Sequence, residues 1–505
     1  MPRRPIAPAD LLIPLQPHDA EPMYRQIYRG LRDAILQRRL APGARVPSTR
    51  TLSRDLGVSR NTVLLAFDQL LAEGYLVGSG GSGTYVAPEL PDRFLTVGAK
   101  PRAGGGAAAP AGRLSRRGAG LVGFPTGAPR LNEPARAFRT GTPALDAFPI
   151  DLWARLAARR YRRLSIALLE HGDPAGYWPL REAIAEHVRA ARGVQCEPAQ
   201  VIVLGAAQQA IELAARALLD PGDAVWLEEP GYLGARGALL AAGARLVPVP
   251  VDREGIDVAR GMALGPDARL VYVSPSHQYP TGATLSLSRR LALLRWAGEA
   301  GAWILEDDYD SEYRYAGRPL MALQGLDRDG RVLYVGTFSK TLFPSIRLAY
   351  LIAPKPLVPA LVSIRGIGDQ HASTIEQAVV ADFMTEGHFA RHVRRMRALY
   401  AERRAVFLDA AARWLDGLLE PLPADGGMHV LGLLREGVDD REASRAAAER
   451  GIEVSPLSLY YAGPCPRGGL LIGYAAVPSG LIPGAVRRLA DALRAIPQQS
   501  GRRRR

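Results

Sequence analysis

The chain has 505 residues, roughly three times the size of an ordinary domain, and its hydrophobic content of 47% is typical of globular protein. Its two cysteines exclude a disulfide framework and indicate a reducing cytoplasm; with neither a secretory signal nor an apolar run of about 18 residues, we expect no membrane partner. The net charge of +14 is concentrated in the first 88 residues, in the segment after them and in the terminal GRRRR, which favours an anionic polymer as partner unless these arginines only aid solubility.

Residues 1–88 show the element order of a winged helix-turn-helix domain. Apolar residues recur at helical spacing over 23–39, a short helix is predicted over 49–57, and a third helix over 60–74. The stretch YLVGSGGSGTYVAP, residues 75–88, predicts two short strands joined by a glycine-rich tip. Its GSGGSG lacks the following helix and the lysine of a phosphate-binding loop, so we interpret it as the tip of the wing.

The start of the third helix carries the residue types that read DNA. In a helix-turn-helix motif the second helix, here the third helix of the domain, enters the major groove by its N-terminus. The residues before it bind phosphates. Arg60 can pair with guanine and Asn61 with adenine. A protein-interaction module is the alternative role for such a fold. The predicted DNA-contacting residues are Arg45, Arg50, Ser59, Arg60, Asn61 and Thr62.

After this unit the composition changes twice. Residues 89–123 have no apolar periodicity and are rich in Gly, Ala, Pro and Arg, which predicts a flexible basic linker. Over 124–497 short β-branched runs alternate with helices, which predicts an α/β domain with a mostly parallel sheet and a smaller, more helical C-terminal part. Residues 498–505 form a basic tail.

Lysine is rare in this chain, and one lysine lies in an unusual place. Of the 64 basic residues only Lys100, Lys340 and Lys355 are lysines. Lys340 follows a predicted strand, in GTFSKTLFPSIRLAY. A lysine amine can lose its proton and attack a carbonyl, whereas an arginine guanidinium stays charged. Lys340 is therefore a candidate nucleophile, with an ordinary surface lysine as the alternative.

The residues around other strand ends would suit a pyridoxal phosphate site. Such a site needs an amine, a carboxylate for the ring nitrogen, a donor to the ring oxygen and a cradle for phosphate. AWILEDDYDSEY supplies carboxylates at a strand end, and GAAQQAIEL offers free N–H groups at a strand-to-helix junction. Tyr232 in EEPGY is a stacking ring, and Thr337, Ser339 and Arg347 are further phosphate donors.

Residues 22–87 resemble the DNA-binding domain of GntR-type bacterial regulators. The resemblance rests on RVPSTRTLSRDLGVSRNTVLLAFDQLLAEGYL and GSGTYV. It implies that Arg50, Ser59, Arg60 and Asn61 contact operator DNA. Leu64 stands where some relatives have a further basic residue.

Residues from about 124 to 495 resemble fold-type I aminotransferases through EEPGY, SPSHQYPTG, EDDYDSEY and GTFSKTLFPSIRLAY. The resemblance implies pyridoxal 5'-phosphate as cofactor, held as a Schiff base on Lys340. It also implies that Asp307 pairs with the pyridine nitrogen, that Tyr309 holds the 3'-oxygen and that Tyr232 stacks on the ring. The implied phosphate-binding residues are Ala207, Gln208, Thr337, Ser339 and Arg347. No metal site is expected.

Two stretches depart from the aminotransferase pattern. SPSHQYPTG replaces NPxNPTG, and either His277 or Gln278 takes the place of its asparagine. In GGLLIGYAAV, Leu471 occupies the position of the arginine that usually holds the substrate's α-carboxylate. Another arginine, such as Arg236 or Arg467, could reach the same place; otherwise the ligand is not an amino acid held by its carboxylate.

A GntR-type winged helix joined to an aminotransferase-like domain is the architecture of the MocR/GabR regulators. This resemblance implies a bacterial, cytoplasmic regulator that associates with the nucleoid on a double-stranded DNA operator. It also implies a head-to-tail homodimer that senses a small molecule, either an amino compound or pyridoxal phosphate itself. We expect no physiological turnover, although an aminotransferase half-reaction is compatible with the residues present. The alternatives are an active aminotransferase that carries a DNA-binding module, and a constitutive DNA-binding protein with an inactive domain.

Overall fold

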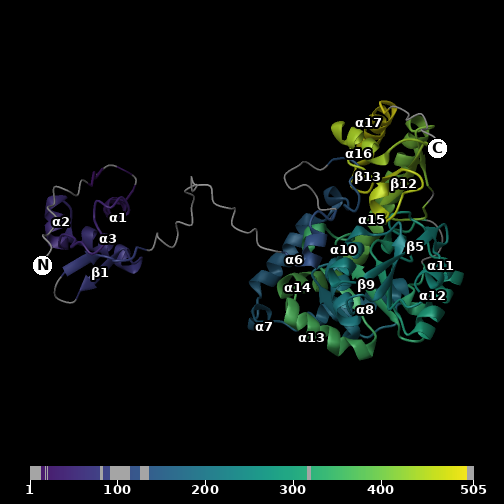
Figure 1. Cartoon of the computed structure of the whole chain (residues 1–505), viewed down its shortest axis with the longest axis horizontal. Helices are drawn as coiled ribbons and strands as arrows, with labels where there is room; N and C mark the ends of the chain where they lie inside the picture. Colours follow the sequence, from purple (N-terminus) through teal and green to yellow (C-terminus); the bar gives the residue numbers. More distant parts are fainter. Residues whose placement is uncertain are drawn as a thin grey trace. The chain divides into compact units, whose positions relative to one another are not determined.

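The computed structural model describes residues 13–16, 19, 21–79, 83–90, 114–125, 136–315, 320–422 and 424–496. The chain divides into two compact units, Met1–Gly112 and Arg113–Arg505 (Figure 1). Most of the predicted linker and all of the predicted basic tail lie outside the described residues. In the part of the chain that is described, no helix combines the length and the apolar character needed to cross a membrane.

The first unit is a winged helix-turn-helix, as predicted. Its elements are α1 (Met23–Leu36), α2 (Thr49–Asp55), α3 (Arg60–Ala72), β1 (Leu76–Ser79) and β2 (Gly83–Val86), the two strands pairing antiparallel. One face of α1 buries Ile27, Leu31 and Ile35 against α3 and the wing, which is the apolar stripe expected from the sequence. The predicted first helix was too long at its C-terminal end, because Arg38 adopts a left-handed conformation with φ of 59°.

The second unit is built on an eight-stranded sheet. Its strand order is β3-β10-β9-β8-β7-β4-β5-β6. The pairs β9·β8, β8·β7, β7·β4 and β4·β5 are parallel, while β10 and β6 run antiparallel to their neighbours. The strands are β3 (Val201–Leu204), β4 (Ala224–Glu229), β5 (Arg245–Asp252), β6 (Gly255–Ile256), β7 (Leu270–Val273), β8 (Trp303–Asp308), β9 (Val332–Thr337) and β10 (Ala349–Ile352). The predicted mostly parallel sheet is confirmed.

Helices cover both faces of this sheet, so its strands are buried on both sides (Figure 1). Alternate residues of each strand belong to opposite clusters: Val225 and Leu227 pack towards α9 and α10, whereas Trp226 packs towards α11 and α12. The helices are α6 (Ile150–Arg162), α7 (Ile166–Leu169), α8 (Trp178–Arg192), α9 (Ala207–Leu218), α10 (Leu233–Ala242), α11 (Val258–Leu264), α12 (Leu287–Ala300), α13 (Val358–Gly368) and α14 (Thr374–Thr385).

A smaller C-terminal part carries an antiparallel sheet of order β11-β12-β14-β13. Its strands are β11 (Leu419–Pro421), β12 (His429–Leu434), β13 (Ser455–Pro456) and β14 (Gly469–Gly473), and its helices are α15 (His388–Trp414), α16 (Asp440–Glu449) and α17 (Ile482–Arg494). Tyr400 and Phe407 of α15, a helix of 27 residues, pack with Phe138 and Ile472 in its core. Residues 136–144 therefore belong with this part although they lie far away in sequence.

A short helix begins the second unit inside the segment that composition predicts to be linker. Helix α5 (Arg116–Leu121) is capped by Ser115, whose hydroxyl accepts the N–H of Gly118. The segment packs on α10, where a Cβ at Gly237 would lie 3.1 Å from Cε1 of Phe124. The predicted linker, residues 89–123, thus ends in residues that fold with the second unit, because small residues such as Gly237 leave room for an aromatic ring.

Candidate functional site

Lys340 lies just after β9 and faces the loop at residue 141. Its Nζ donates a hydrogen bond to the carbonyl of Gly141 at 2.8 Å. Gly141 has φ of +72°, and a Cβ there would lie 2.7 Å from Nζ, so glycine is required for this approach. Burial lowers the pKa of Lys340, with Asp310 and Asp307 opposing that shift. The amine is therefore easier to deprotonate than that of an exposed lysine.

Asp307, near the end of the neighbouring strand β8, is a half-satisfied buried carboxylate. Its Oδ2 accepts a hydrogen bond from the hydroxyl of Tyr272 on β7. Its Oδ1 is buried and accepts no hydrogen bond from any residue that the structure describes. Burial raises the pKa of Asp307 to about 6, against the hydrogen bond from Tyr272. A buried acceptor beside an amine fits the ring N–H of a pyridinium, so these residues suit pyridoxal phosphate.

Tyr309 and His277 form a hydrogen-bonded pair next to this carboxylate. The Tyr309 hydroxyl lies 2.8 Å from Nδ1 of His277, and the same nitrogen lies 3.1 Å from both oxygens of Asp310. Gln278 is used differently: its amide bonds the carbonyls of Pro230 and Tyr279, and its oxygen accepts from Thr281. Of the two residues considered for the missing asparagine, only His277 is hydrogen-bonded to Tyr309 among the described residues.

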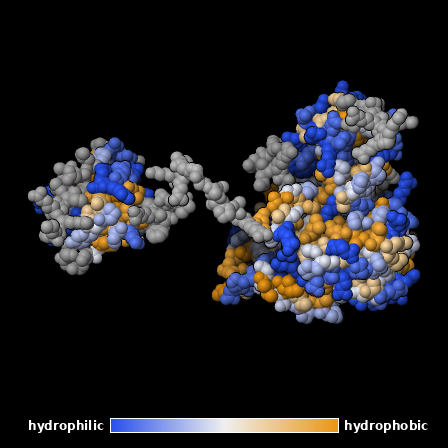
Figure 2. Space-filling view, viewed as in Figure 1, coloured by the Kyte–Doolittle hydropathy of each residue, from blue (hydrophilic) through white to orange (hydrophobic). Residues whose placement is uncertain are grey.

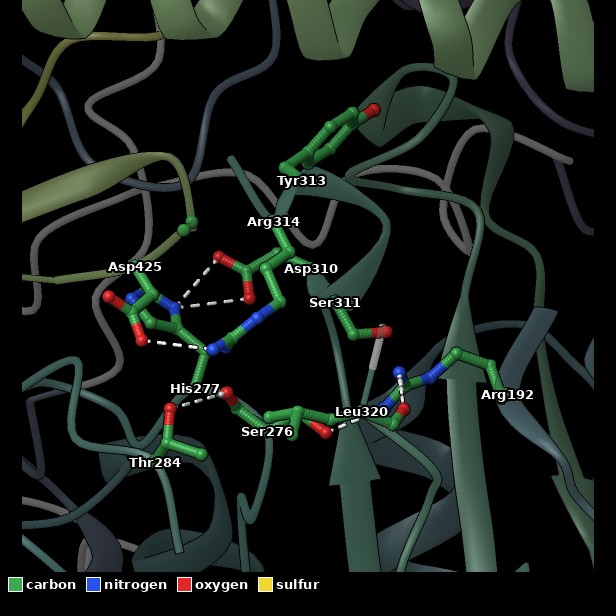
Figure 3. Close-up of a pocket in the computed structure, with 12 residues that line it drawn as sticks. Arg192, Ser276, His277, Thr284, Asp310, Ser311, Tyr313, Arg314, Leu320 and Asp425 are labelled. Carbon is green, nitrogen blue, oxygen red and sulfur yellow. Dashed lines mark hydrogen bonds and ion pairs between the residues drawn. The ribbon is translucent and has the colours of Figure 1, made fainter. Parts of the chain in front are cut away.

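Figure 3 shows a pocket lined by His277, Asp310 and Arg192. A cavity of about 20 Å³ lies there, large enough for one water molecule. At its edge Arg192 pairs with Asp308 at 2.7 Å and donates to Ser276. These buried contacts fix the turn after β8. One ligand atom from each of His277, Asp310 and His429 lies within 4.8 Å of the other two. Nδ1 of His277 is hydrogen-bonded to Tyr309 and Asp310, whereas its buried Nε2 has no hydrogen-bond partner among the described residues.

The N-terminus of α9 lies at the same edge of the sheet and presents free amides. The N–H groups of Gln209 and Ala210 both reach back to the carbonyl of Ala206. The N–H groups of Ala207 and Gln208 accordingly have no acceptor among the described residues. Together with the helix dipole they form an anion-binding end.

The remaining predicted residues surround that end. A Cβ at Gly234 would lie 2.4 Å from the ring of Tyr232 and 2.5 Å from Oε1 of Gln208, so these two side chains meet at a glycine. Burial raises the pKa of Tyr232 to about 12, with smaller effects from Asp307, which raises it, and Arg347, which lowers it. Tyr232 thus lies within electrostatic reach of both.

Thr337 ends β9, and its hydroxyl accepts the N–H of Ser339 at 3.1 Å. Arg347, exposed and in the left-handed conformation with φ of 49°, precedes β10. Its carbonyl oxygen would lie 3.9 Å from a Cβ at Gly205, where β3 turns into α9. The structure therefore brings all the residues predicted for the cofactor to one edge of the sheet.

The candidate nucleic-acid interface lies at the start of α3. Arg60 and Asn61 are exposed, and their side chains make no hydrogen bond within the described part of the chain. Ser59 and Thr62 are used for capping: the Ser59 hydroxyl accepts the Thr62 N–H at 3.1 Å and lies 2.8 Å from the Thr62 hydroxyl. Arg50 is exposed on α2.

Arg45 lies against the wing. Its backbone bridges to Tyr85, and a Cβ at Gly83 would lie 2.9 Å from its Nε. Gly83 has φ of +119°, which favours glycine, and the missing side chain gives the guanidinium room beside the first residue of β2, at the tip end of the wing. Arg45 is thus positioned by the hairpin rather than by α2.

Sequence reasoning missed Tyr272, Gly141 and Asp310. A phenol in the buried strand LVYV needs a hydrogen-bond partner, which could have indicated Tyr272 as a neighbour of the carboxylates. Gly141 is separated from Lys340 by 199 positions and carries no local signal. Asp310 belongs to EDDYDSEY, but the motif alone does not show which acid faces His277.

Two family models match the chain. Bacterial regulatory proteins of the gntR family match residues 23–86, and aminotransferases of class I and II match residues 144–489. Together they cover both units.

Relatives match across the whole length. A probable rhizopine catabolism regulatory protein, MocR, of Rhizobium meliloti is 43% identical over 94% of each chain. The pyridoxine biosynthesis regulator PdxR of Corynebacterium glutamicum is 34% identical over 96% of this chain and 99% of its own. Among solved structures, the α-aminoadipate aminotransferase LysN of Thermus thermophilus, complexed with a phosphopyridoxyl-leucine, is 31% identical, with a TM-score of 0.66 over 71% of this chain and 92% of its own.

Proposed function

The chain belongs to the MocR type of GntR-family transcriptional regulators, in which an aminotransferase-like domain binds pyridoxal phosphate, and we propose that it regulates transcription in response to a small molecule bound at Lys340. One observation supports this most directly. The buried amine of Lys340 lies one strand away from the buried carboxylate of Asp307, whose Oδ1 has no hydrogen-bond partner among the described residues. The relatives that match across both units are regulators, which favours this role over that of an enzyme carrying a DNA-binding module.

Pyridoxal phosphate, when bound, supplies an aldehyde and an electron-accepting ring. In our proposal Lys340 binds the aldehyde, Asp307 holds the ring nitrogen, and Tyr232 stacks on the ring. Tyr309, oriented by His277, holds the ring hydroxyl. Ala207 and Gln208 bind the phosphate through their N–H groups, with Thr337, Ser339 and Arg347 as further donors.

The first unit is the operator-binding part. Arg60 and Asn61 would read bases in the major groove, because they are exposed at the start of α3. Arg45, Arg50 and the capped Ser59–Thr62 turn would contact phosphates. Such a regulator would act on nucleoid DNA in the bacterial cytoplasm.

A second copy of the chain is the expected partner of the large unit. Ile150, Ile166, Leu169 and Ile367 are 63%, 75%, 65% and 84% exposed, on α6, α7 and α13. Figure 2 shows apolar surface around α7 and α13. A patch of this kind marks an interface, and we propose a homodimer, in the head-to-tail arrangement that the family resemblance implies.

The small molecule is an amino compound in our proposal, since the cofactor aldehyde that Lys340 would hold can also react with the amine of a ligand, which would free Lys340. Pyridoxal phosphate itself is a second candidate, because a relative that is 34% identical is named as a regulator of pyridoxine biosynthesis. The two differ in experiment: only the second predicts that cofactor added to the cofactor-free protein changes the affinity for DNA.

The test compares Lys340→Ala with the matched control Lys355→Ala. Lys355 is exposed and pairs with Glu197 at 2.6 Å. After borohydride reduction, wild-type protein and the Lys355 variant should retain covalent cofactor by mass spectrometry, and Lys340→Ala should not. Binding to the duplex upstream of its own gene should respond to amines only where cofactor is retained. Covalent cofactor on Lys340→Ala at the wild-type level contradicts the assignment.

A further inference from the structure

A row of neutral hydroxyl groups continues from the loop that Lys340 faces. Gly141 accepts the hydrogen bond of Lys340, and the preceding residue, Thr140, lies beside the hydroxyl of Tyr279, whose pKa it lowers against the larger effect of burial. The Tyr279 hydroxyl lies 3.0 Å from the hydroxyl of Tyr460. Burial raises the pKa of Tyr279 and of Tyr460, so both phenols stay neutral. The ring of Tyr279 also makes an edge contact with that of Tyr232, 5.9 Å between centroids.

Behind these phenols the wall is apolar. Leu471 on β14 is fully buried, and it packs with Leu431 and Tyr460 in one cluster. The ring of Tyr279 packs against the same cluster. Where the aminotransferase pattern has an arginine, the chain therefore presents a leucine that is part of a closed hydrophobic core.

Among the described residues, three arginines that could replace the missing one, Arg236, Arg467 and Arg139, are engaged elsewhere. Arg236 donates to the carbonyls of Tyr460 at 2.7 Å and Tyr461 at 3.1 Å, and pairs with Glu229 at 3.3 Å. Arg467 donates to the carbonyl of Leu434 and pairs with Glu420.

Arg139, which precedes Thr140, pairs with Glu453 at 2.8 Å. Moving any of these arginines would leave a carbonyl or a carboxylate without its donor. A carboxylate placed against Leu471 would therefore lose water without gaining any of these three guanidinium groups, which is strongly unfavourable.

We propose that the molecule recognised beside Lys340 is a primary amine with a neutral, hydroxyl-bearing body and no carboxylate. The inference rests on the proposed function, since the amine must reach a cofactor held by Lys340. Thr140, Tyr279 and Tyr460 can each donate or accept a hydrogen bond, which suits the hydroxyl groups of an amino alcohol or amino polyol. Amino acids are disfavoured because their carboxylate would meet Leu471.

The experiment uses two ligands that differ only at the carboxylate. L-Serine becomes 2-amino-1,3-propanediol when its carboxylate is replaced by a hydroxymethyl group. Each is titrated into the full-length, cofactor-loaded protein while the absorbance of the bound cofactor is followed. We expect the diol to act at a concentration lower by about tenfold or more. Equal potency, or a preference for serine, overturns the inference.

Two variants test the residues. Leu471→Arg should reverse the preference towards serine, whereas Leu481→Arg, the same change at an exposed position, should leave it as in wild type. If Leu471→Arg loses its cofactor, Tyr460→Phe decides: the diol should weaken by roughly 3–10-fold while serine is unaffected, and an unchanged ratio contradicts the inference.

The outcomes separate the two proposals. If the wild-type protein carries no cofactor absorbance that depends on Lys340, the proposed function fails, and the selectivity inference fails with it. If the cofactor is present and serine binds as well as the diol, only the selectivity inference fails. If the cofactor absorbance responds to the diol in preference to serine but DNA binding does not change, the inferred class of ligand holds. In that case the proposed link between the ligand and transcription fails.

Discussion

The carboxyl group of Asp307 is buried, so its ionised form is disfavoured, and only one of its two oxygens accepts a hydrogen bond from a described residue. Tyr272 satisfies one oxygen, and the other has no donor among the described residues. Its pKa is raised to about 6 from 3.8, which corresponds to a cost of roughly 3 kcal/mol for holding the charge at neutral pH in the cofactor-free protein. The ionised carboxylate therefore destabilises the cofactor-free protein, and a bound cation would remove this cost. A residue that only stabilised the fold would not carry such a cost.

We predict that Asp307→Asn has opposite effects on the two forms of the protein. The cofactor-free variant should be as stable as wild type or more stable at pH 7.5, because the desolvated charge is removed. Its affinity for pyridoxal phosphate should fall by about tenfold or more, because the ring nitrogen loses an ionic partner. Thermal unfolding of cofactor-free protein and a cofactor titration measure the two effects. A variant that loses stability and keeps full affinity would contradict this assignment.

Glu228 on β4 carries a second buried carboxyl group with a testable pH dependence. Burial raises its pKa to about 8 from 4.5, although it accepts from the N–H of Ser274 and the amide of Gln278. A pKa raised on folding means that the folded state holds the proton more tightly. The stability from this group is full below pH 4.5 and is lost as the pH rises through 8.

Glu228→Gln, which is neutral at every pH, should therefore lose less stability than wild type between pH 6 and pH 9. Denaturant unfolding at several pH values measures it, and Asp267→Asn, at an exposed pair with Arg245, is the control. Parallel profiles for wild type and Glu228→Gln would show that Glu228 is ionised throughout this range.

At the residue scale, the sequence predicted which residues could carry out the chemistry of the site better than it predicted which residues contact one another. The residue types at successive strand ends predicted a cofactor site before any geometry was known, and the resemblance to aminotransferases assigned Lys340, Asp307 and Tyr309 to it. The sequence could not separate His277 from Gln278, because the difference lies in which backbone carbonyls the amide reaches. Ser59 was predicted as a DNA contact, and its hydroxyl also forms a helix cap, a use that depends on local backbone angles.

At the scale of elements, the order of helices and strands followed from periodicity, and the exceptions have local causes. The β-branched runs that alternate with helices became the parallel core of the sheet. Helix α5 was missed, because RRGAGL has no apolar stripe and is stabilised by Ser115 and by the neighbouring contact of Phe124 with α10. The antiparallel direction of β10 was not predicted, because the apolar pattern of a short strand does not show whether it runs parallel or antiparallel to its neighbours.

The wing offers a matched pair of glycines for a prediction at this scale. Gly83→Ala should lower the stability of the first unit by roughly 1–2 kcal/mol, because it forces a Cβ into φ of +119° and against Arg45. It should also weaken binding to all duplex sequences alike by displacing a phosphate contact. Gly78→Ala, in the same hairpin with open space around it, should change neither property. Thermal unfolding and DNA titrations distinguish the two, and equal effects would remove Arg45 from the interface.

At the scale of the whole molecule, two units with separate cores divide the work. The second unit, Arg113–Arg505, contains every residue proposed for the cofactor, and the first contains every residue predicted to contact DNA. The charge pattern indicated this division, and the two family models match it. What sequence could not provide is the boundary, because residues 116–121 have the composition of a linker and the structure of a helix.

A chain that begins at Arg113 should keep the cofactor and lose operator binding. The second unit has its own core, so its cofactor absorbance should match that of the full chain. Duplex affinity should fall to the weak, salt-dependent level that a basic tail alone provides. Titrations at two salt concentrations measure this. Operator affinity that survives the deletion would assign DNA binding to the tail instead.

Helix α10 touches three parts of this protein at once. It begins directly after Tyr232, its Arg236 holds the backbone carbonyls of Tyr460 and Tyr461, and its Gly237 receives the ring of Phe124. A ligand that shifts α10 would therefore also shift Phe124, which lies close in sequence to the segment that connects the two units. If such a ligand changes the affinity for DNA, DNA binding changes the affinity for the ligand by the same factor, because coupling free energies are reciprocal. The operator is then an effector of the small-molecule site, as much as the small molecule is an effector of the operator.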